Sequence, residues 1–257
     1  PPGGFEAPEA VRYRSGGQRG MQQDMKQKKF DSIDTALDRL KDGDTVLVGG
    51  FGLSGIPEKL INGVCERGLR DLTVVNNSSG AGRFGVARLL EKGCVAKVIV
   101  SFPWGRESDV FKELYEAGKV DLEIVPQGIL AERMRAAGAG LGGILSPSGV
   151  GTQIAEGKPI HMVGDQEYIV ETALPGDVAL IKAHKVDPRG NLIYRLASQN
   201  MNPVMAMAAK HTIVEVDAEV ALGDLAPAEI ITPGVFVDRY VVTGRYKPEA
   251  WEGAWHE

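Results

Sequence analysis

The 257-residue sequence contains few of the residues that would indicate a metal site, a disulfide framework or a membrane segment. Its only two cysteines, Cys65 and Cys94, form no Cys-x-x-Cys pair, so neither zinc binding nor thiol–disulfide chemistry is indicated. We expect two free thiols in a reducing cytoplasm. The four histidines share no ligand spacing, so we expect no metal. No apolar run reaches the ~18 residues that are needed to span a membrane.

An excess of basic residues is also missing. The chain has 34 acidic and 29 basic residues and a formal net charge of -5, whereas a general nucleic-acid binder carries a basic face. The hydrophobic fraction of 43% and the charged fraction of 25% are ordinary for a soluble globular protein. We expect a disordered extension over residues 1–24, which are rich in Pro, Gly, Gln and Arg, a domain over 25–243 and an unpatterned tail over 244–257.

Short apolar segments alternate with amphipathic segments up to about residue 136. Each apolar segment is continuous and is followed by a helical pattern, which indicates a parallel sheet with helices on both faces. The expected strands are 45–48, 72–75, 97–101 and 122–125. The expected helices are 32–40, 58–67, 85–92, 109–117 and 129–136.

The pattern changes at Gly138. Residues 138–157 are rich in glycine, and we interpret them as a long functional loop. A hairpin over 160–163 and 168–171 is expected next, followed by further strands and one helix, 203–209. Those later strands are expected at 178–183, 192–194, 212–216 and 236–242. The predicted fold is therefore α/β, with a mostly parallel sheet and a smaller β-rich part after about residue 155.

A glycine-rich loop follows the first expected strand. Gly50, Gly52 and Gly55 match the pattern Gly-x-Gly-x-x-Gly between a strand and a helix, where a backbone can approach a phosphate at the helix N-terminus. A dinucleotide site also needs an acidic residue at the end of the next strand, but that strand ends in Asn76 and Asn77. A nucleotide-binding oxidoreductase and a tight turn without a ligand both stay open as interpretations.

The same loop resembles a signature of the 3-oxoacid CoA-transferase family, to which the 3-oxoadipate enzymes belong. The resemblance lies in residues 42–51 (DGDTVLVGGF) and 55–57 (GIP), and it continues nearly in register from about residue 30 to residue 243. Further matching segments are 71–77, 123–128, 130–136, 138–140, 146–152, 177–183, 190–192 and 200–203. The resemblance implies a CoA-transferase-like fold and a loop that lies against CoA, formed by Gly49, Gly50, Phe51, Gly52, Leu53, Ser54 and Gly55.

One element of that family is missing from the sequence. The family's nucleophile is a glutamate in a Ser-Glu-Asn-Gly segment that belongs to the second half of the enzyme, and no such segment occurs in this chain. The resemblance therefore implies an α (A-type) subunit that is active only with a β (B-type) subunit carrying the catalytic glutamate, most simply as an α2β2 heterotetramer. It also implies a CoA thioester as substrate and no tightly bound cofactor.

The resemblance further implies the reaction. CoA would move from succinyl-CoA to a 3-oxo acid through a glutamyl-CoA thioester on the partner. Residues 101–152 look most like the 3-oxoadipate enzyme and residues 51–57 more like the acetoacetate enzyme, and we prefer 3-oxoadipate. A CoA-thioester hydrolase on the same fold is the alternative chemistry.

Polar residues follow three further strands, where ligands bind in open α/β sheets. The resemblance places Gln127 in the active-site wall, where its amide is suited to stabilise an oxyanion; otherwise it is a strand-end residue with backbone bonds. Asn76 and Asn77 either bind CoA or substrate or form Asx-turns. Ser101 and Phe102 either line the acyl pocket or form a simple turn.

Overall fold

The computed structural model describes residues 27–80, 82–104 and 109–245. The expected extension over residues 1–24 lies outside this range, as does the tail from residue 246. No helix in the described ranges is long and apolar enough to cross a membrane.

The four strand–helix units expected up to residue 136 are present, although the first helix is shorter than predicted. The strands are β1 (Thr45–Val48), β2 (Leu72–Val75), β3 (Val95–Val100), β4 (Asp121–Ile124), β5 (Gly143–Ser146), β6 (Ile160–Val163), β7 (Gln166–Thr172), β8 (Gly176–Val186), β9 (Leu192–Ile193), β10 (Ala209–Glu219) and β11 (Arg239–Val242). The α-helices are α1 (Ile33–Ala36), α2 (Glu58–Glu66), α3 (Val86–Glu91), α4 (Asp109–Glu116), α5 (Gln127–Gly138) and α6 (Asn202–Ala208). Short 3-10 turns are Gln153–Ala155, Leu196–Ser198, Pro227–Glu229 and Gly234–Phe236.

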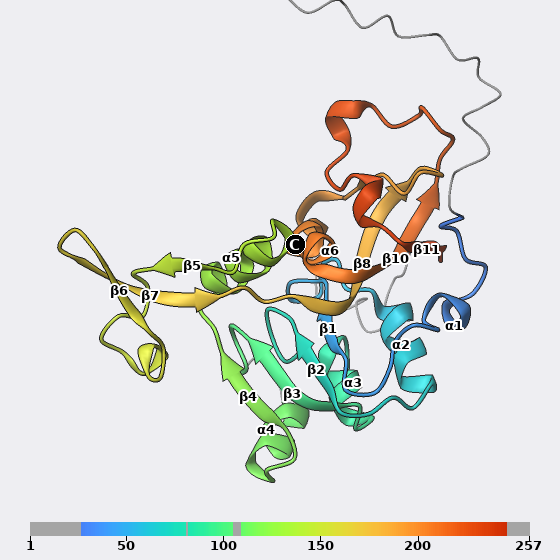
Figure 1. Ribbon diagram of the computed structural model, residues 1–257. Coiled ribbons are helices and arrows are strands. Elements are labelled where there is room, and N and C mark those ends of the chain that lie inside the picture. Colours follow the sequence, from blue (N-terminus) through green and yellow to red (C-terminus); the bar gives the residue numbers. More distant parts are fainter. Residues whose placement is uncertain (1–26, 81, 105–108, 246–257) are drawn as a thin grey trace, which may run out of the picture.

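The main sheet confirms the predicted fold class. Its strands run parallel in the order β11-β10-β8-β1-β2-β3-β4, and β9 adds an antiparallel pairing to β8. Helices cover both faces (Figure 1). Because side chains alternate along a strand, Val46 and Val48 pack with α1–α4, whereas Leu47 packs with α5 and α6. The continuous apolar runs in the sequence reflect this burial on both faces.

The glycine-rich stretch at residues 138–157 is not the long loop that we predicted. Residues 143–146 form β5, which pairs antiparallel with β7, and β6 completes a three-stranded sheet that projects from the main sheet (Figure 1). A Cβ atom at Gly143 would lie 2.4 Å from the Glu171 carbonyl oxygen. Gly143 therefore allows the backbones of β5 and β7 to approach closely. The glycine-rich composition of this stretch had suggested a loop, but the glycine serves a strand pairing.

The smaller β-rich part is also more limited than its predicted start at residue 155 implied. It consists of β5, β6 and β7, and the later strands β8, β10 and β11 return to the main sheet. As a result β1 lies between β2 and β8. The strands β2, β3 and β4 continue the sheet on one side of β1, and β8, β10 and β11 continue it on the other. In open α/β sheets such a switch point marks the crevice in which ligands bind, outside the carboxyl ends of the strands.

Candidate functional site

The carboxyl ends of β1 to β4 lie along one edge of the sheet, so the residues predicted from the sequence lie along that edge. The Asn76 Nδ2 atom donates a hydrogen bond to the Val48 carbonyl oxygen at 2.6 Å, joining the ends of β2 and β1. The Asn77 carbonyl oxygen accepts hydrogen bonds from the Ser101 and Phe102 amides at 3.1 and 3.0 Å, joining the ends of β2 and β3. These bonds link the segments that follow β1, β2 and β3. We call the edge of the sheet formed by the carboxyl ends of β1 to β4 the rim.

The glycine loop, residues 49–55, begins at the end of β1 and has a hairpin-like tip. The backbones of Phe51 and Ser54 exchange two hydrogen bonds of 3.0 Å, with Gly52 and Leu53 between them. Gly52 has a φ of +57°, and a Cβ atom on it would meet no atom of the chain within 4 Å. The Phe51 side chain is 44% exposed despite its size. The tip, residues 51–53, is therefore the part of the loop that a ligand can reach.

The other three glycines of this loop are required by the protein's own packing. A Cβ atom would lie 1.8 Å from Asn202 Oδ1 at Gly49, 2.5 Å from Ile56 Cγ1 at Gly50 and 2.4 Å from the Ser198 carbonyl oxygen at Gly55. Gly50 and Gly55 also have positive φ values, +114° and +71°. The glycine pattern thus reflects close packing at its two ends and an open tip between them.

The N-terminus of α2, directly after this loop, is already bound by a carboxylate. The amides of Lys59 and Leu60 donate to Glu215 Oε2 at 2.8 and 3.3 Å, and the Glu215 side chain is fully buried. Burial also raises the pKa of the Glu58 carboxyl in the same turn, and its Oε1 atom accepts from the Gly85 amide. A pyrophosphate in the dinucleotide-binding mode needs these helix amides, so the geometry argues against that interpretation.

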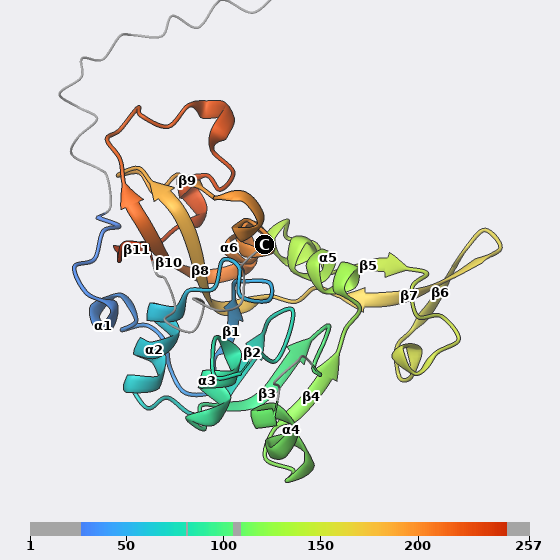
Figure 2. The same ribbon diagram turned by 180° about the vertical axis from the view of Figure 1, so that it is seen from behind.

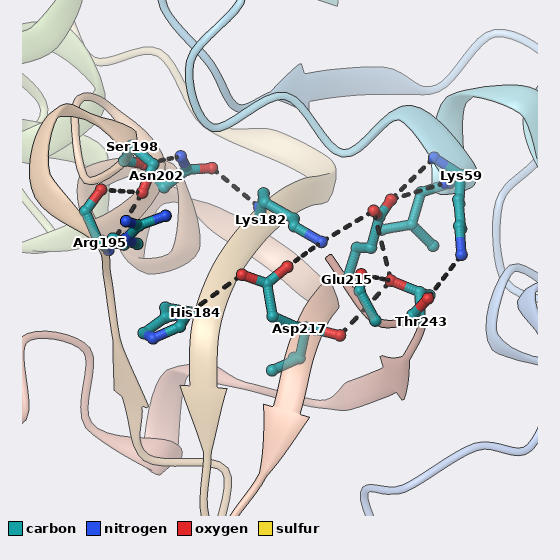
Figure 3. A network of polar contacts seen from close by, with 12 residues as sticks. Lys59, Lys182, His184, Arg195, Ser198, Asn202, Glu215, Asp217 and Thr243 are labelled. Atoms are coloured by element: carbon teal, nitrogen blue, oxygen red, sulfur yellow. Dashed lines mark hydrogen bonds and ion pairs between the residues drawn. The ribbon is translucent and has the colours of Figure 1, made fainter. Parts of the chain in front are cut away.

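Glu215 belongs to a network of charged groups on β8 and β10 (Figure 3). Its Oε1 atom accepts from Lys182 Nζ at 3.0 Å, and the same ammonium lies 2.8 Å from Asp217 Oδ1. The Nδ1 atom of His184 lies 3.1 Å from Asp217 Oδ2. The Lys182 ammonium compensates the buried negative charge of Glu215. The bonds from Glu215 to the Lys59 and Leu60 amides anchor the N-terminus of α2 to β10, next to the end of the glycine loop. Across the described ranges, no three His, Cys, Asp or Glu side chains are arranged to hold a metal ion.

The side chains at the strand ends differ in whether their polar atoms have hydrogen-bond partners. Asn76 forms an Asx-turn, because its Oδ1 atom accepts from the Ser78 amide at 2.9 Å. In contrast, Asn77 Oδ1 and Ser101 Oγ are buried and have no hydrogen-bond partner among the described residues. Buried polar atoms without partners are uncommon and draw attention to a missing ligand or water. Phe102 beside them is 59% exposed.

Gln127 is the first residue of α5, directly after Pro126 at the end of β4. It is exposed, and no group in the described part of the chain is hydrogen-bonded to its side-chain amide. A role for this amide at the rim stays a prediction.

Three residues next to the site were missed by the sequence analysis. Asn200 and Asn202 contact the glycine loop, and Glu215 caps α2. The sequence did contain a signal for Glu215, since a carboxylate within the apolar run 213–216 of β10 requires a buried partner. The two asparagines lie in the matching segment 200–203, but nothing local indicates their contacts with the loop, because their partners lie about 150 residues earlier.

Known proteins that are similar to this chain show its family. The family model described as Coenzyme A transferase matches residues 30–243. The A-type subunit of the 3-oxoadipate CoA-transferase of Pseudomonas putida is 52% identical over 214 residues, which cover 83% of this chain and 93% of that protein. The A-type subunit of the succinyl-CoA:3-ketoacid coenzyme A transferase of Helicobacter pylori strain J99 is 45% identical over 225 residues, 88% of this chain and 94% of that protein.

A solved structure shows the same fold. The acyl-CoA transferase of Escherichia coli O157:H7, in a thioester complex with CoA, superposes with a TM-score of 0.75 at 22% identity. The match covers 84% of this chain and 50% of that one. On the family model and the two curated relatives, the chain belongs to the coenzyme A transferase family.

Proposed function

We propose that this chain is the α subunit of a two-subunit CoA-transferase that moves CoA from succinyl-CoA to a 3-oxo acid, 3-oxoadipate in preference to acetoacetate. A glutamate carboxylate of the β subunit would attack the thioester carbonyl and expel CoA thiolate, which leaves a mixed anhydride of glutamate and succinate. The thiolate would then attack the glutamyl carbonyl, release succinate and form the glutamyl-CoA thioester. The carboxylate of the 3-oxo acid would take up CoA by the reverse sequence. The observation that carries the proposal is the open tip of the glycine loop at the switch point of the sheet, in a chain 52% identical to the Pseudomonas putida protein.

This chain would supply binding and electrostatic stabilisation to that reaction. The loop tip, residues 51–53, would lie against CoA, with the exposed Phe51 ring as its apolar contact. The free amide of Gln127 would donate to the oxyanion of each tetrahedral intermediate. The partnerless Asn77 Oδ1 and Ser101 Oγ atoms would face the substrate side of the rim, where Phe102 is exposed.

The substrate is tested with the reconstituted two-subunit enzyme and succinyl-CoA as donor. We expect kcat/KM for 3-oxoadipate to exceed that for acetoacetate by about tenfold or more, a difference of ~1.4 kcal/mol in transition-state binding. A preference for acetoacetate would overturn the choice of acceptor. Release of free CoA at the same rate with and without an acceptor would instead support the hydrolase alternative.

The Gln127 amide is tested by substitution. Losing one oxyanion donor typically costs about 100- to 1000-fold in turnover, and because water can partly replace an exposed side chain we expect roughly 10- to 100-fold for Gln127→Ala. Gln127→Glu should be slower still, since it adds negative charge beside a forming oxyanion. CoA affinity should change much less than turnover.

Steady-state kinetics of the assembled enzyme measure this effect, with thermal melting as the control for folding. Turnover within about twofold of the parent in both variants, well under ~1 kcal/mol, would remove Gln127 from the catalytic machinery.

A further inference from the structure

We propose that Asn200 and Asn202 are positioning residues that set the conformation of the glycine loop before CoA arrives. This inference rests on the proposed function, because it assigns a task within the same site. Asn200 lies just before α6 and Asn202 is the first residue of α6, and this N-terminus of α6 lies beside the loop (Figure 2). Neither is a catalytic residue, since each acts through the loop backbone.

Asn200 holds the loop at both ends of its tip. Its Oδ1 atom accepts from the Gly50 amide at 3.3 Å, and its Nδ2 atom donates to the Ser54 carbonyl oxygen at 3.0 Å. The same Oδ1 atom also accepts from the amide of Met201 at 2.7 Å, which fixes the side-chain rotamer. One amide group thereby sets the span between residues 50 and 54, and the tip between them is left free.

Asn202 ties the end of the loop to the sheet. Its side chain is fully buried, and its Nδ2 atom donates to the carbonyl oxygens of Gly55 at 3.1 Å and Ser198 at 2.8 Å. Its Oδ1 atom accepts from the Lys182 amide of β8 at 3.1 Å. A buried polar group needs partners for its donors and its acceptor, and this uncharged amide makes these two donations and this one acceptance at this position. The space it fills is the space that a Cβ on Gly49 would occupy.

The two asparagines and the glycines together fix the two ends of the loop. The loop backbone is held at Gly50, Ser54 and Gly55, whereas no side chain of segment 195–202 restrains residues 51–53 in the hydrogen bonds of the described chain. A binding loop held in its bound conformation avoids the ordering cost on association. Losing the restraint should weaken the binding of acyl-CoA by the same amount in the ground state and in the transition state. KM for acyl-CoA should therefore rise while kcat stays the same.

The test uses the assembled two-subunit enzyme with four variants, of which the fourth, Asn200→Asp, is a partial rescue. Asn200→Ala removes both contacts to the loop at a half-buried position. Asn202→Asp keeps the acceptor for the Lys182 amide but loses the donor to Gly55, and it serves if Asn200→Ala does not assemble. Asn191→Ala is the matched control: Asn191 also bonds through both amide atoms, to Asp187 Oδ2 and the Gly234 amide, each at 2.8 Å, without touching the loop.

We expect Asn200→Ala and Asn202→Asp to raise KM for succinyl-CoA and Kd for free CoA about tenfold, with kcat within twofold of the parent. KM for the acceptor acid should not change. Asn200→Asp, which keeps the acceptor for the Gly50 amide, should recover part of the affinity. Asn191→Ala should lower the melting temperature and leave KM and Kd as in the parent. Unchanged CoA affinity in both loop variants, or an equal rise in the control, would overturn the proposal.

Hydrogen exchange of the ligand-free enzyme separates this inference from the proposed function. The Gly50 amide should exchange faster in Asn200→Ala than in the parent and in Asn191→Ala, whatever the loop binds. Faster exchange together with a parent enzyme that binds no CoA would mean that the proposed function fails while the restraint on the loop is real. Exchange equal to that of the parent would sink the positioning role itself.

Discussion

The purified chain alone should not exchange label between succinate and succinyl-CoA, and co-expression with its β subunit should restore the exchange. The reason is chemical: the proposed reaction proceeds through a carboxylate nucleophile, and this sequence has no Ser-Glu-Asn-Gly segment to supply it. Loss of a covalent nucleophile can cost on the order of a million-fold in turnover, so the isolated chain should be inactive within detection.

Isotope exchange measured on the chain, on the β subunit and on the co-purified complex tests this directly. A complex in which the glutamate of the partner's Ser-Glu-Asn-Gly segment is replaced by glutamine is the matched control, because it should assemble and bind CoA without exchanging label. Robust exchange by this chain alone would contradict the two-subunit proposal and would require a nucleophile within residues 1–257.

Substitution of the buried Glu215 should produce a large loss of stability. Glu215→Ala would leave the Lys59 and Leu60 amides without their acceptor, and it would leave the Lys182 ammonium with Asp217 as its remaining carboxylate partner. Removing one member of a buried ion pair typically costs ~3–5 kcal/mol. Glu215→Gln should cost less, since its carbonyl oxygen still accepts from the two helix amides.

Urea unfolding followed by circular dichroism gives the free energy of unfolding for each variant. Asp34→Ala is the control, because Asp34 pairs with Arg67 at 2.6 Å but its side chain is 77% exposed. An exposed pair is worth about 0–1 kcal/mol, so the control should change stability little. A Glu215→Ala variant no less stable than Asp34→Ala would show that the buried network does not anchor α2.

The position of the glycine loop was predictable because its signals are local. A continuous apolar strand at residues 45–48 and a helix from residue 58 bracket it, and the strand–helix alternation continues up to α5. Each of these elements is defined by its own side chains, since burial on both faces gives an apolar run and a surface helix gives a 3.6-residue period. The same reasoning placed Gln127, Asn77 and Ser101 at strand ends, where the structure has them.

Elements that depend on distant partners were not predictable in this way. Gly143–Ser146 is a strand only because it pairs with β7, and its glycines favour a loop when they are considered alone. The strands after β7 gave no indication that β8 would insert beside β1, which precedes it by more than 100 residues. Strand order is set by the burial of both sheet faces at once, and no local pattern contains that information.

The sequence by itself therefore determined the α/β class, the strand–loop–helix unit around residues 49–55 and the absence of the family's nucleophile. Only the tertiary structure decided which glycines of the loop are required by packing and which one is open, because the answer depends on neighbours such as Asn202 and Ser198 that the fold brings into contact. It also decided that Glu215 bonds the first amides of α2, which leaves them no hydrogen to offer a phosphate. A helix N-terminus attracts any nearby anion, and in this fold that anion is the protein's own carboxylate.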